Sequence, residues 1–225
     1  LAALLDSIGD EFEEAVETIY ACEGRVVVTG VGKSGHVGLK IAATLSSTGT
    51  PAYFVHASEA AHGDLGLVGA DDIVLAISNS GETVELSAIM QYCRRFGVKL
   101  IVLTSQRDST LGRFASLSLI LPPVDEACPL KLAPMTSTTM TLVLGDALAA
   151  ALIRKRGFSS EQFARFQPGG KLGTQLLRIS ELLEREPSFG DIPTVAEDAD
   201  IDAVVATITE GRFGFTAVAD AEGRI

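Results

Sequence analysis

A glycine-rich loop that carries a lysine follows the first apolar run of the chain. The β-branched run 26–29 leads into Gly-Val-Gly-Lys-Ser-Gly at residues 30–35. Glycines permit tight backbone turns, and the free N–H groups at the start of a helix favour an anion. Lys33 adds a positive charge at the same place, next to Ser34. The loop therefore predicts an anion site with a reactive lysine.

Two nucleotide-binding motifs resemble this loop and must be tested against it. A Walker A loop needs a glycine six residues before its lysine, and position 27 is Val. The dinucleotide pattern G-x-G-x-x-G does fit residues 30–35, but it also needs an acidic residue at the end of the second strand. That strand, roughly 52–55, closes with His56, and Glu59 lies beyond it. An NAD-type oxidoreductase is therefore disfavoured, while a turn serving only chain reversal leaves the lysine unexplained.

A second strand–turn–helix unit has hydroxyl groups where the first has its lysine. The apolar run 72–77 leads into Ser-Asn-Ser-Gly-Glu-Thr at residues 78–83. Such side chains and the N–H groups at a helix start can form a phosphate nest. The alternative is ordinary helix capping by Ser80, with Thr83 or Glu82 behind it, but one residue would suffice for that. The predicted phosphate ligands are Ser78, Ser80, Gly81 and Thr83, together with Ser34.

Two of the three histidines of the chain follow the second strand. His56 and His62 are six residues apart, at the strand end where α/β sheets bind ligands. An isolated histidine is usually structural, whereas this pair makes a binding role equally plausible. No third residue has the spacing of a metal ligand. A binding role and a structural role therefore stay equally open for this pair, and a metal site is disfavoured.

The elements that position these residues alternate along the chain. Strands separated by helices predict an α/β fold of three layers, in which helices flank a five-stranded parallel sheet. A helix over residues 2–22 precedes the sheet, and a very apolar helix over 135–156 is expected to pack against the sheet and another subunit. The predicted strands begin near residues 26, 52, 72, 99 and 116.

Composition limits the function further. The net charge of −11 argues against nucleic acid and against anionic membrane as partners. We find no signal peptide and expect no apolar run long enough to span a bilayer. The three cysteines are widely spaced, which suits a reducing cytoplasm. The expectation is a cytoplasmic protein with a small-molecule ligand.

The last part of the chain differs in character. Charged residues become frequent after about residue 177, and Pro187, Gly190 and Pro193 indicate a linker. Residues 193–220 look like the start of a small α/β module, within which the chain stops. We therefore expect one domain over 1–178, and a linker with a partial module over 179–225.

Five motifs of the chain occur together in one known family. The set resembles the sugar isomerase (SIS) domain of D-arabinose-5-phosphate isomerases over roughly residues 1–178, and the segment from about 180 resembles a truncated first half of a cystathionine-β-synthase-type (CBS) pair. The motifs are Gly-Lys-Ser-Gly (32–35), His-Gly-Asp-Leu-Gly (62–66), Ser-Asn-Ser-Gly-Glu-Thr (78–83), Glu-Ala-Cys-Pro-Leu with Leu-Ala-Pro (126–134) and Pro-Gly-Gly-x-Leu-Gly (168–173).

The resemblance implies a specific reaction. It is the interconversion of D-ribulose 5-phosphate and D-arabinose 5-phosphate, on the way to 3-deoxy-D-manno-octulosonate and lipopolysaccharide. A proton moves between C1 and C2 through a cis-enediol, so a base, a proton donor and a charge stabiliser are needed. The resemblance also implies a homotetramer, no cofactor and no required metal.

The resemblance assigns roles to individual residues. It marks Lys33, Glu85 and Glu126 as catalytically relevant, and our hypothesis makes Lys33 the oxyanion stabiliser and Glu126 the base. Glu85 would then orient Lys33 or the sugar hydroxyls. The substrate contacts that the resemblance adds are Gly49, Thr50 and His62, with His56 as a substrate ligand and a candidate site for inhibitory zinc.

One position departs from the family. Gln167 stands where the family has a catalytic histidine before Pro-Gly-Gly. Glutamine forms hydrogen bonds but does not exchange a proton near neutral pH. An impaired enzyme, another acid/base group, a divergent branch and an engineered change are all open explanations. The departure also keeps open a sugar-phosphate-binding SIS regulator without catalysis, although the CBS-like segment favours the isomerase.

Overall fold

The computed structural model describes residues 1–166, 192–211 and 214–225. The chain forms two compact units, Leu1–Gln167 and Pro168–Ile225. The predicted site residue Gln167, the glycine motif at 168–173 and the predicted boundary at residue 178 lie outside the described residues. All other candidate site residues belong to the first unit.

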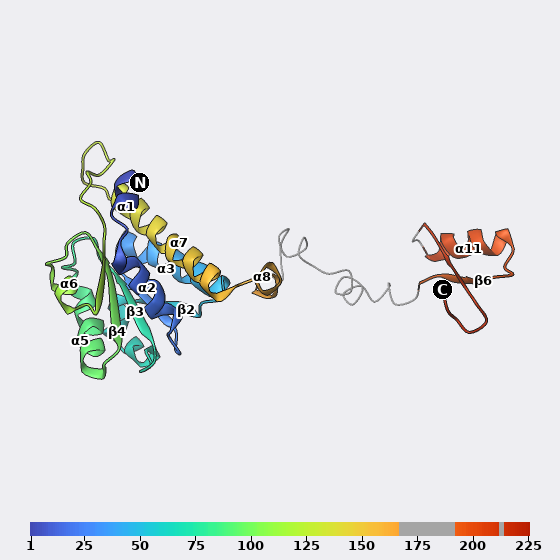
Figure 1. The fold of residues 1–225 in the computed structure, drawn as a ribbon, viewed down its shortest axis with the longest axis horizontal. Coiled ribbons are helices and arrows are strands. Elements are labelled where there is room, and N and C mark those ends of the chain that lie inside the picture. Colours follow the sequence, from blue (N-terminus) through green and yellow to red (C-terminus); the bar gives the residue numbers. More distant parts are fainter. Residues whose placement is uncertain (167–191, 212–213) are drawn as a thin grey trace. The chain divides into compact units, whose positions relative to one another are not determined.

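Five parallel strands form the central sheet of the first unit, in the order β2-β1-β3-β4-β5 (Figure 1). β1 and β3 are buried along their whole length, because their apolar side chains face a layer of helices on each side. The predicted α/β fold with a five-stranded parallel sheet is confirmed. The strands are β1 (Val26–Gly30), β2 (Ala52–His56), β3 (Ile73–Ile77), β4 (Lys99–Thr104) and β5 (Leu117–Ile120).

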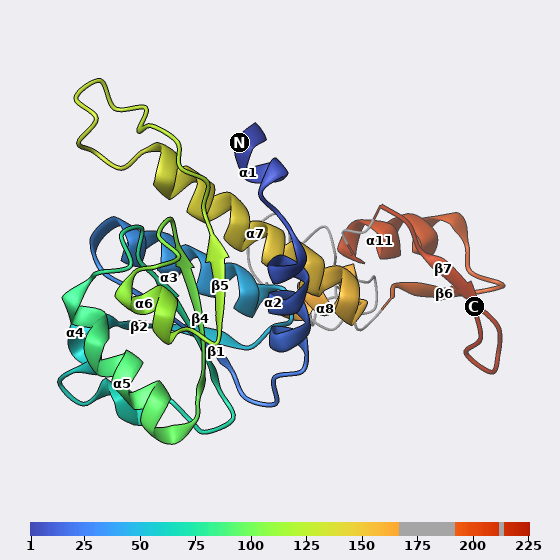
Figure 2. The same ribbon diagram turned by 60° about the vertical axis from the view of Figure 1, so that its left-hand side comes forward.

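Helices cover both faces of this sheet (Figure 2). Side chains of β1 alternate between the layers: Val26 and Val28 pack in one apolar core, and Val27 packs in the other. The predicted three layers are therefore present. The first core includes α2 (Asp10–Tyr20), α3 (Gly32–Ser47) and α7 (Thr136–Arg156), and the second includes α4 (Ala57–Ala60), α5 (Ser87–Phe96) and α6 (Thr110–Phe114).

Two predicted helices have different bounds in the structure. The helix expected over 2–22 is divided into α1 (Ala2–Asp6) and α2, because Gly9 is extended, with φ −132° and ψ −159°. The helix expected after the hydroxyl-rich turn begins with a short 3₁₀ helix, η2 (Val84–Leu86), before α5. Another 3₁₀ helix, η1 (Asp64–Leu67), follows α4. The division of the first helix leaves Leu5 and Ile8 exposed, whereas Leu4, Val16 and Ile19 pack in the core.

The long helix α7 is a core helix of the first unit. It contacts α2 and α3, and Gly145 lets it approach Ile41 of α3 closely. By length and composition alone α7 could cross a membrane, contrary to the sequence expectation that no such run exists. Its buried residues, such as Leu148 and Leu152, pack within the first apolar core. This packing is what a core helix of a globular domain shows.

Short elements complete the description. α8 (Ser160–Phe166) begins with a capping box, in which Gln162 N–H donates to Ser159 Oγ at 3.3 Å and Ser159 N–H donates to Gln162 Oε1 at 2.9 Å. In the second unit, β6 (Thr194–Ala196) and β7 (Ala217–Ala219) pair in parallel, with α11 (Ile201–Gly211) between them in the chain. These three elements follow one another in the order β–α–β, and the CBS-like nature of this unit stays a prediction.

Candidate functional site

The carboxyl ends of β2, β1 and β3 bring the two predicted anion loops together. Gly30 at the end of β1 is paired with His56 on one side and with Ile77 on the other. The chain runs from β1 to β2 on one side of it and then crosses to β3 on the other, so the order reverses between β1 and β3. Ligands of open α/β sheets bind at such a reversal. The loop after β1 and the turn after β3 therefore leave the sheet side by side at a favourable place.

Close packing of α3 on β1 shapes the lysine loop. A side chain on Gly30 would lie 3.2 Å from the backbone of Gly35, and one on Gly35 would lie 3.0 Å from the carbonyl of Gly30. Gly32 has φ +57°, which favours glycine. The glycines thus allow helix and strand to approach, which explains the G-x-G-x-x-G spacing without a dinucleotide.

Lys33 lies exposed in the first turn of α3. Within the part of the chain that the structure describes, its ammonium group has neither an ion pair nor a hydrogen bond. The Ser34 hydroxyl beside it is likewise without a protein partner there. A cation and a hydroxyl at a helix start are therefore available to a ligand.

The turn 78–83 is closed by its own side chains. Ser78, which is 2% exposed, accepts the N–H of Gly81 at 3.0 Å, and its Oγ lies 2.7 Å from Oγ1 of Thr83. Ser80 is exposed, and its Oγ accepts the N–H of Glu82 at 3.3 Å. The capping alternative fails, because no side chain of the turn caps η2 or α5. Ser78 thus shapes the turn, and Ser80 keeps its O–H for a ligand.

Residues at the end of β4 and after it hold the same turn in place. The carbonyl of Asn79 accepts hydrogen bonds from Ser105 N–H at 3.0 Å, from Ser105 Oγ at 2.7 Å and from Thr104 Oγ1 at 3.2 Å. Gly81 has φ +68°, and a side chain there would overlap Ser109. The turn is therefore held rigidly before any ligand arrives, as a preorganised anion site requires.

Glu126 does not lie free in its loop but caps α7. Its carboxylate accepts the N–H groups of Met135 and Thr136 at 2.6 Å each, and it also accepts hydrogen bonds from Ser137. Burial acts to raise the pKa of Glu126, but the hydrogen bonds from the Ser137 hydroxyl and from these N–H groups outweigh it and lower the pKa. The carboxylate is therefore ionised and a weak base as described. The sequence showed only an irregular loop here, because the capping partners lie about ten residues away.

The other charged candidates are less engaged. Glu85 lies exposed in η2, and the structure shows no ion pair between it and Lys33. His56 ends β2, and its Nδ1 accepts the N–H of Ser58 at 3.3 Å. His62 is exposed in the turn after α4. The two histidines thus lie at and beyond the end of the strand next to β1. No group of three His, Cys, Asp or Glu among the described residues could hold a metal ion.

Gly49 and Thr50 lie apart from these residues. They follow the carboxyl end of α3, whose 16 residues span about 24 Å from the lysine loop. Thr50 is 2% exposed, and its Oγ1 accepts a hydrogen bond from Arg156 Nε at 3.2 Å. Gly49 borders a cleft of about 370 Å³ that Phe158 also lines. Within one chain, this pair does not join the site at the carboxyl edge of the sheet.

Comparison with known proteins agrees with this geometry. Residues 19–151 match the model of the SIS domain family. The arabinose 5-phosphate isomerase KdsD of Yersinia pestis is 50% identical over 226 residues, which cover 100% of this chain and 68% of that protein. KdsD of Pseudomonas aeruginosa is 47% identical over 99% of this chain and 68% of its own length.

The chain belongs to the SIS-domain arabinose 5-phosphate isomerase family.

Solved structures extend the comparison to the fold of this SIS domain. That of E. coli CFT073 c3406 in complex with arabinose 5-phosphate has a TM-score of 0.70 and 43% identity, and the match covers 73% of this chain and 89% of that one. The Vibrio vulnificus NanR protein complexed with ManNAc-6P has a TM-score of 0.61 at 20% identity, over 81% of this chain and 65% of that one. The latter likeness shows a shared fold alone.

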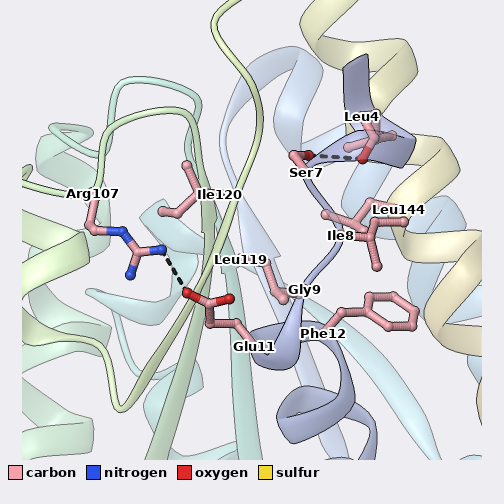
Figure 3. Close-up of a pocket in the computed structure, with 10 residues that line it drawn as sticks. All are labelled: Leu4, Ser7, Ile8, Gly9, Glu11, Phe12, Arg107, Leu119, Ile120 and Leu144. Atoms are coloured by element: carbon pink, nitrogen blue, oxygen red, sulfur yellow. Dashed lines mark hydrogen bonds and ion pairs between the residues drawn. The ribbon is translucent and has the colours of Figure 1, made fainter. Parts of the chain in front are cut away.

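A small pocket beside β5 is not the SIS site. It has a volume of about 40 Å³ and lies between the N-terminal helices, the end of β5 and Leu144 of α7 (Figure 3). That volume holds only a few water molecules. Arg107 points across it to Glu11, with which it forms an ion pair of 2.8 Å (Figure 3). None of the predicted site residues that the structure describes lines this pocket, so it is a packing gap between helices and sheet.

Proposed function

We propose that this chain interconverts D-ribulose 5-phosphate and D-arabinose 5-phosphate. The observation that carries the proposal is the pairing of Gly30 with Ile77, because it sets a lysine loop beside a hydroxyl-rich turn at the reversal of the strand order. The KdsD relatives, similar over the whole chain, support this choice among SIS functions. The proposed pathway leads to 3-deoxy-D-manno-octulosonate and lipopolysaccharide.

The turn after β3 binds the phosphate group in this proposal. The O–H of Ser80 and the backbone N–H groups of Ser80 and Thr83 have no acceptor within the described chain, so they can donate to phosphate oxygens. Ser34 adds a hydroxyl from the neighbouring loop. Ser78 and Gly81 contribute through the shape of the turn, and charge-assisted hydrogen bonds of this kind bind a dianion well.

Lys33 is the proposed electrostatic catalyst. Ribulose 5-phosphate cannot form a furanose ring, because its O5 is esterified, and so it binds as an open chain. A base takes the proton from one of C1 and C2, and an enediolate forms whose charge needs a nearby cation. The ammonium group of Lys33, exposed and unpaired among the described residues, can lie next to that oxygen. His62 is the proposed acid or hydroxyl ligand.

Glu126 and Glu85 are the two proposed bases. The lowered pKa of Glu126 keeps it ionised, but its lone pairs are occupied by the N-terminus of α7. Acting as base therefore requires the loop before α7 to give up part of that cap when substrate binds. Glu85 is unencumbered within the described residues and lies next to the phosphate turn. A direct comparison of the two variants decides between them.

A homotetramer is part of the proposal. Gly49 and Thr50 can reach a substrate at the lysine loop only from another copy of the chain, since about 24 Å separate them within one copy. The loop before α7 also exposes apolar side chains that suit an interface: Leu130 is 75% and Leu132 82% exposed. We also propose a cytoplasmic location, no cofactor and no required metal, with His56 as a candidate site for inhibitory zinc.

Turnover in heavy water tests the function. The protein is incubated with ribulose 5-phosphate in D₂O, and ¹H NMR follows the formation of arabinose 5-phosphate with deuterium at C2. An isomerase forms that product with no added metal or nucleotide. Phosphosugar binding without any product would instead show a regulator. The Gln167→His variant, run alongside, shows whether the glutamine limits the rate.

A further inference from the structure

The phosphate turn is held in place by a helix that follows it much later in the chain. Oε1 of Glu82 accepts the backbone N–H of Thr110 at 2.7 Å, although the two residues are 28 positions apart. The carbonyl of Gly81 accepts the N–H of Leu111 at 3.0 Å. Thr110 and Leu111 open α6, and such first N–H groups have no acceptor within their own helix. The turn therefore serves as part of the cap of α6.

Ser109 completes this contact from the α6 side. Its Oγ accepts the N–H of Gly112 at 3.2 Å and donates to the carbonyl of Gln106 at 2.6 Å. Ser109 also packs against Gly81, which has no side chain to prevent it. The first three N–H groups of α6 are thus bound by Glu82, Gly81 and Ser109. Together they clamp the turn against one end of the helix.

The direction of the Glu82 carboxylate matters for the charge of the site. Glu82 is the single acidic residue in the sequence 78–83, and a free carboxylate there would repel a phosphate dianion. Its charge is directed instead to the Thr110 N–H. The Thr110 hydroxyl, the Thr110 N–H and the charge of Arg113 together lower the pKa of Glu82. The negative charge is therefore bound to a helix N-terminus, where it is favourable.

We propose that Glu82 is a positioning residue for the phosphate of the sugar monophosphate. It fixes Ser80 and Thr83 in a geometry that receives the phosphate, and it keeps its own charge on α6. Glu82 touches no reacting atom in this role. The proposal rests on the proposed function of the turn as the phosphate site, and it adds a residue for which neither the hydroxyl pattern nor the glycine pattern gave a role.

Three variants separate the hydrogen bond of Glu82 from its charge. Glu82→Gln keeps an acceptor and removes the charge, Glu82→Asp keeps the charge but is too short to reach Thr110, and Glu82→Ala removes both. The matched control is Asp108→Ala, because Asp108 is an exposed residue beside α6 whose carboxylate accepts no hydrogen bond from the described residues.

Two measurements are made on each variant: KM and kcat for ribulose 5-phosphate, and the Kd of inorganic phosphate from ³¹P NMR. We expect Glu82→Ala and Glu82→Asp to raise KM and the phosphate Kd about tenfold, because each loses a hydrogen bond made by a charged group. In Glu82→Gln and in the Asp108→Ala control, KM and the phosphate Kd should stay within about twofold of the parent chain. In all four variants kcat should change little.

Each other pattern overturns the proposal. Tighter phosphate binding by both Glu82→Gln and Glu82→Ala would show that Glu82 acts only by its charge. A fall in kcat at constant KM in Gln and Ala would show a direct chemical role. Phosphate binding is measured without turnover. A parent chain that binds phosphate but has no activity would therefore contradict the isomerase function and leave the role of Glu82 standing. A parent chain that binds no phosphate overturns the role of Glu82 itself.

Discussion

Gly30 and Ile77 are paired partners at the carboxyl ends of β1 and β3. Because the strand order reverses between these two strands, the chain leaves them as two adjacent loops with complementary groups. One loop supplies the ammonium of Lys33, and the other supplies the hydroxyl of Ser80 and N–H groups that have no acceptor among the described residues. An open-chain sugar phosphate has its phosphate at one end and its carbonyl at the other. The arrangement of the two loops fits both ends of such a molecule.

Replacing Lys33 should remove most of the catalysis. Lys33→Met keeps the length of the side chain but not its charge, and the loss of one donor to a developing oxyanion lowers kcat by about 10²–10³-fold. Lys40→Met is the matched control, because Lys40 lies on the same helix and pairs with Asp146 at 2.5 Å on the surface. Steady-state kinetics should show a nearly unchanged kcat for the control. Equal kcat values for the parent chain and Lys33→Met would contradict the role of Lys33.

The variants Glu126→Gln and Glu85→Gln should differ in turnover. The base loses most turnover, with sugar-phosphate binding nearly intact, whereas the other glutamate loses less. Glu126→Gln should also lower the free energy of unfolding by about 1 kcal/mol, as the loss of a helix cap does. Urea unfolding and kinetics together show whether Glu126 acts as cap, as base or as both. Full turnover in Glu126→Gln would show that Glu126 acts only as the cap of α7.

The cap of Glu126 predicts a pH dependence of stability. A carboxylate whose pKa is lowered on folding stabilises the fold above its ordinary value of 4.5, and this contribution is lost as the pH falls through the lower value of the folded state. The Glu126→Gln chain should therefore lose less stability than the parent chain on acidification below pH 4.5. Parallel stability curves for the two chains in this range would show that Glu126 is not hydrogen-bonded in solution.

Gly81 should tolerate no side chain. Gly81→Ala requires φ near +68° and overlaps Ser109, so we expect weaker phosphate binding and a loss of stability. Gly97→Ala is the control, because Gly97 has φ +71° at the end of α5 but open space around it. Gly97→Ala should lower the free energy of unfolding by about 1 kcal/mol and leave the phosphate affinity unchanged. Equal losses in both variants would mean that Ser109 does not press on the turn.

Mixing variants tests whether a site is shared between subunits. Lys33→Met is mixed in the unfolded state with Thr50→Val, which should lose activity if Thr50 contacts the substrate, and the mixture is refolded. If Lys33 and Thr50 of one site come from different copies, about a quarter of the sites in an equal mixture regain both residues. Assayed activity should then rise above that of either variant alone. No gain would show that Thr50 does not complete the site of a neighbour.

The fold followed closely from local patterns, because each strand is an apolar run and each turn has its glycine or serine. The sequence also allowed the prediction that residues 30–34 and 78–83 are adjacent, because the carboxyl ends of parallel strands lie at the same edge of a sheet. What the sequence did not reveal are contacts between distant segments. The sequence placed Glu126 in an irregular loop, although it caps α7. It offered Glu82 only a place in the rejected capping alternative, although Glu82 binds Thr110. Both partners depend on tertiary packing.

A crystal structure with arabinose 5-phosphate tests the central claim most directly. The account predicts one sugar phosphate per lysine loop, with its phosphate on the N–H groups and hydroxyls of residues 78–83. The oxygen on C1 or C2 should lie within hydrogen-bond distance of Lys33 Nζ. The account is contradicted if the phosphate lies at Arg156 or another distant cation, or if Lys33 and Ser80 contact no common ligand.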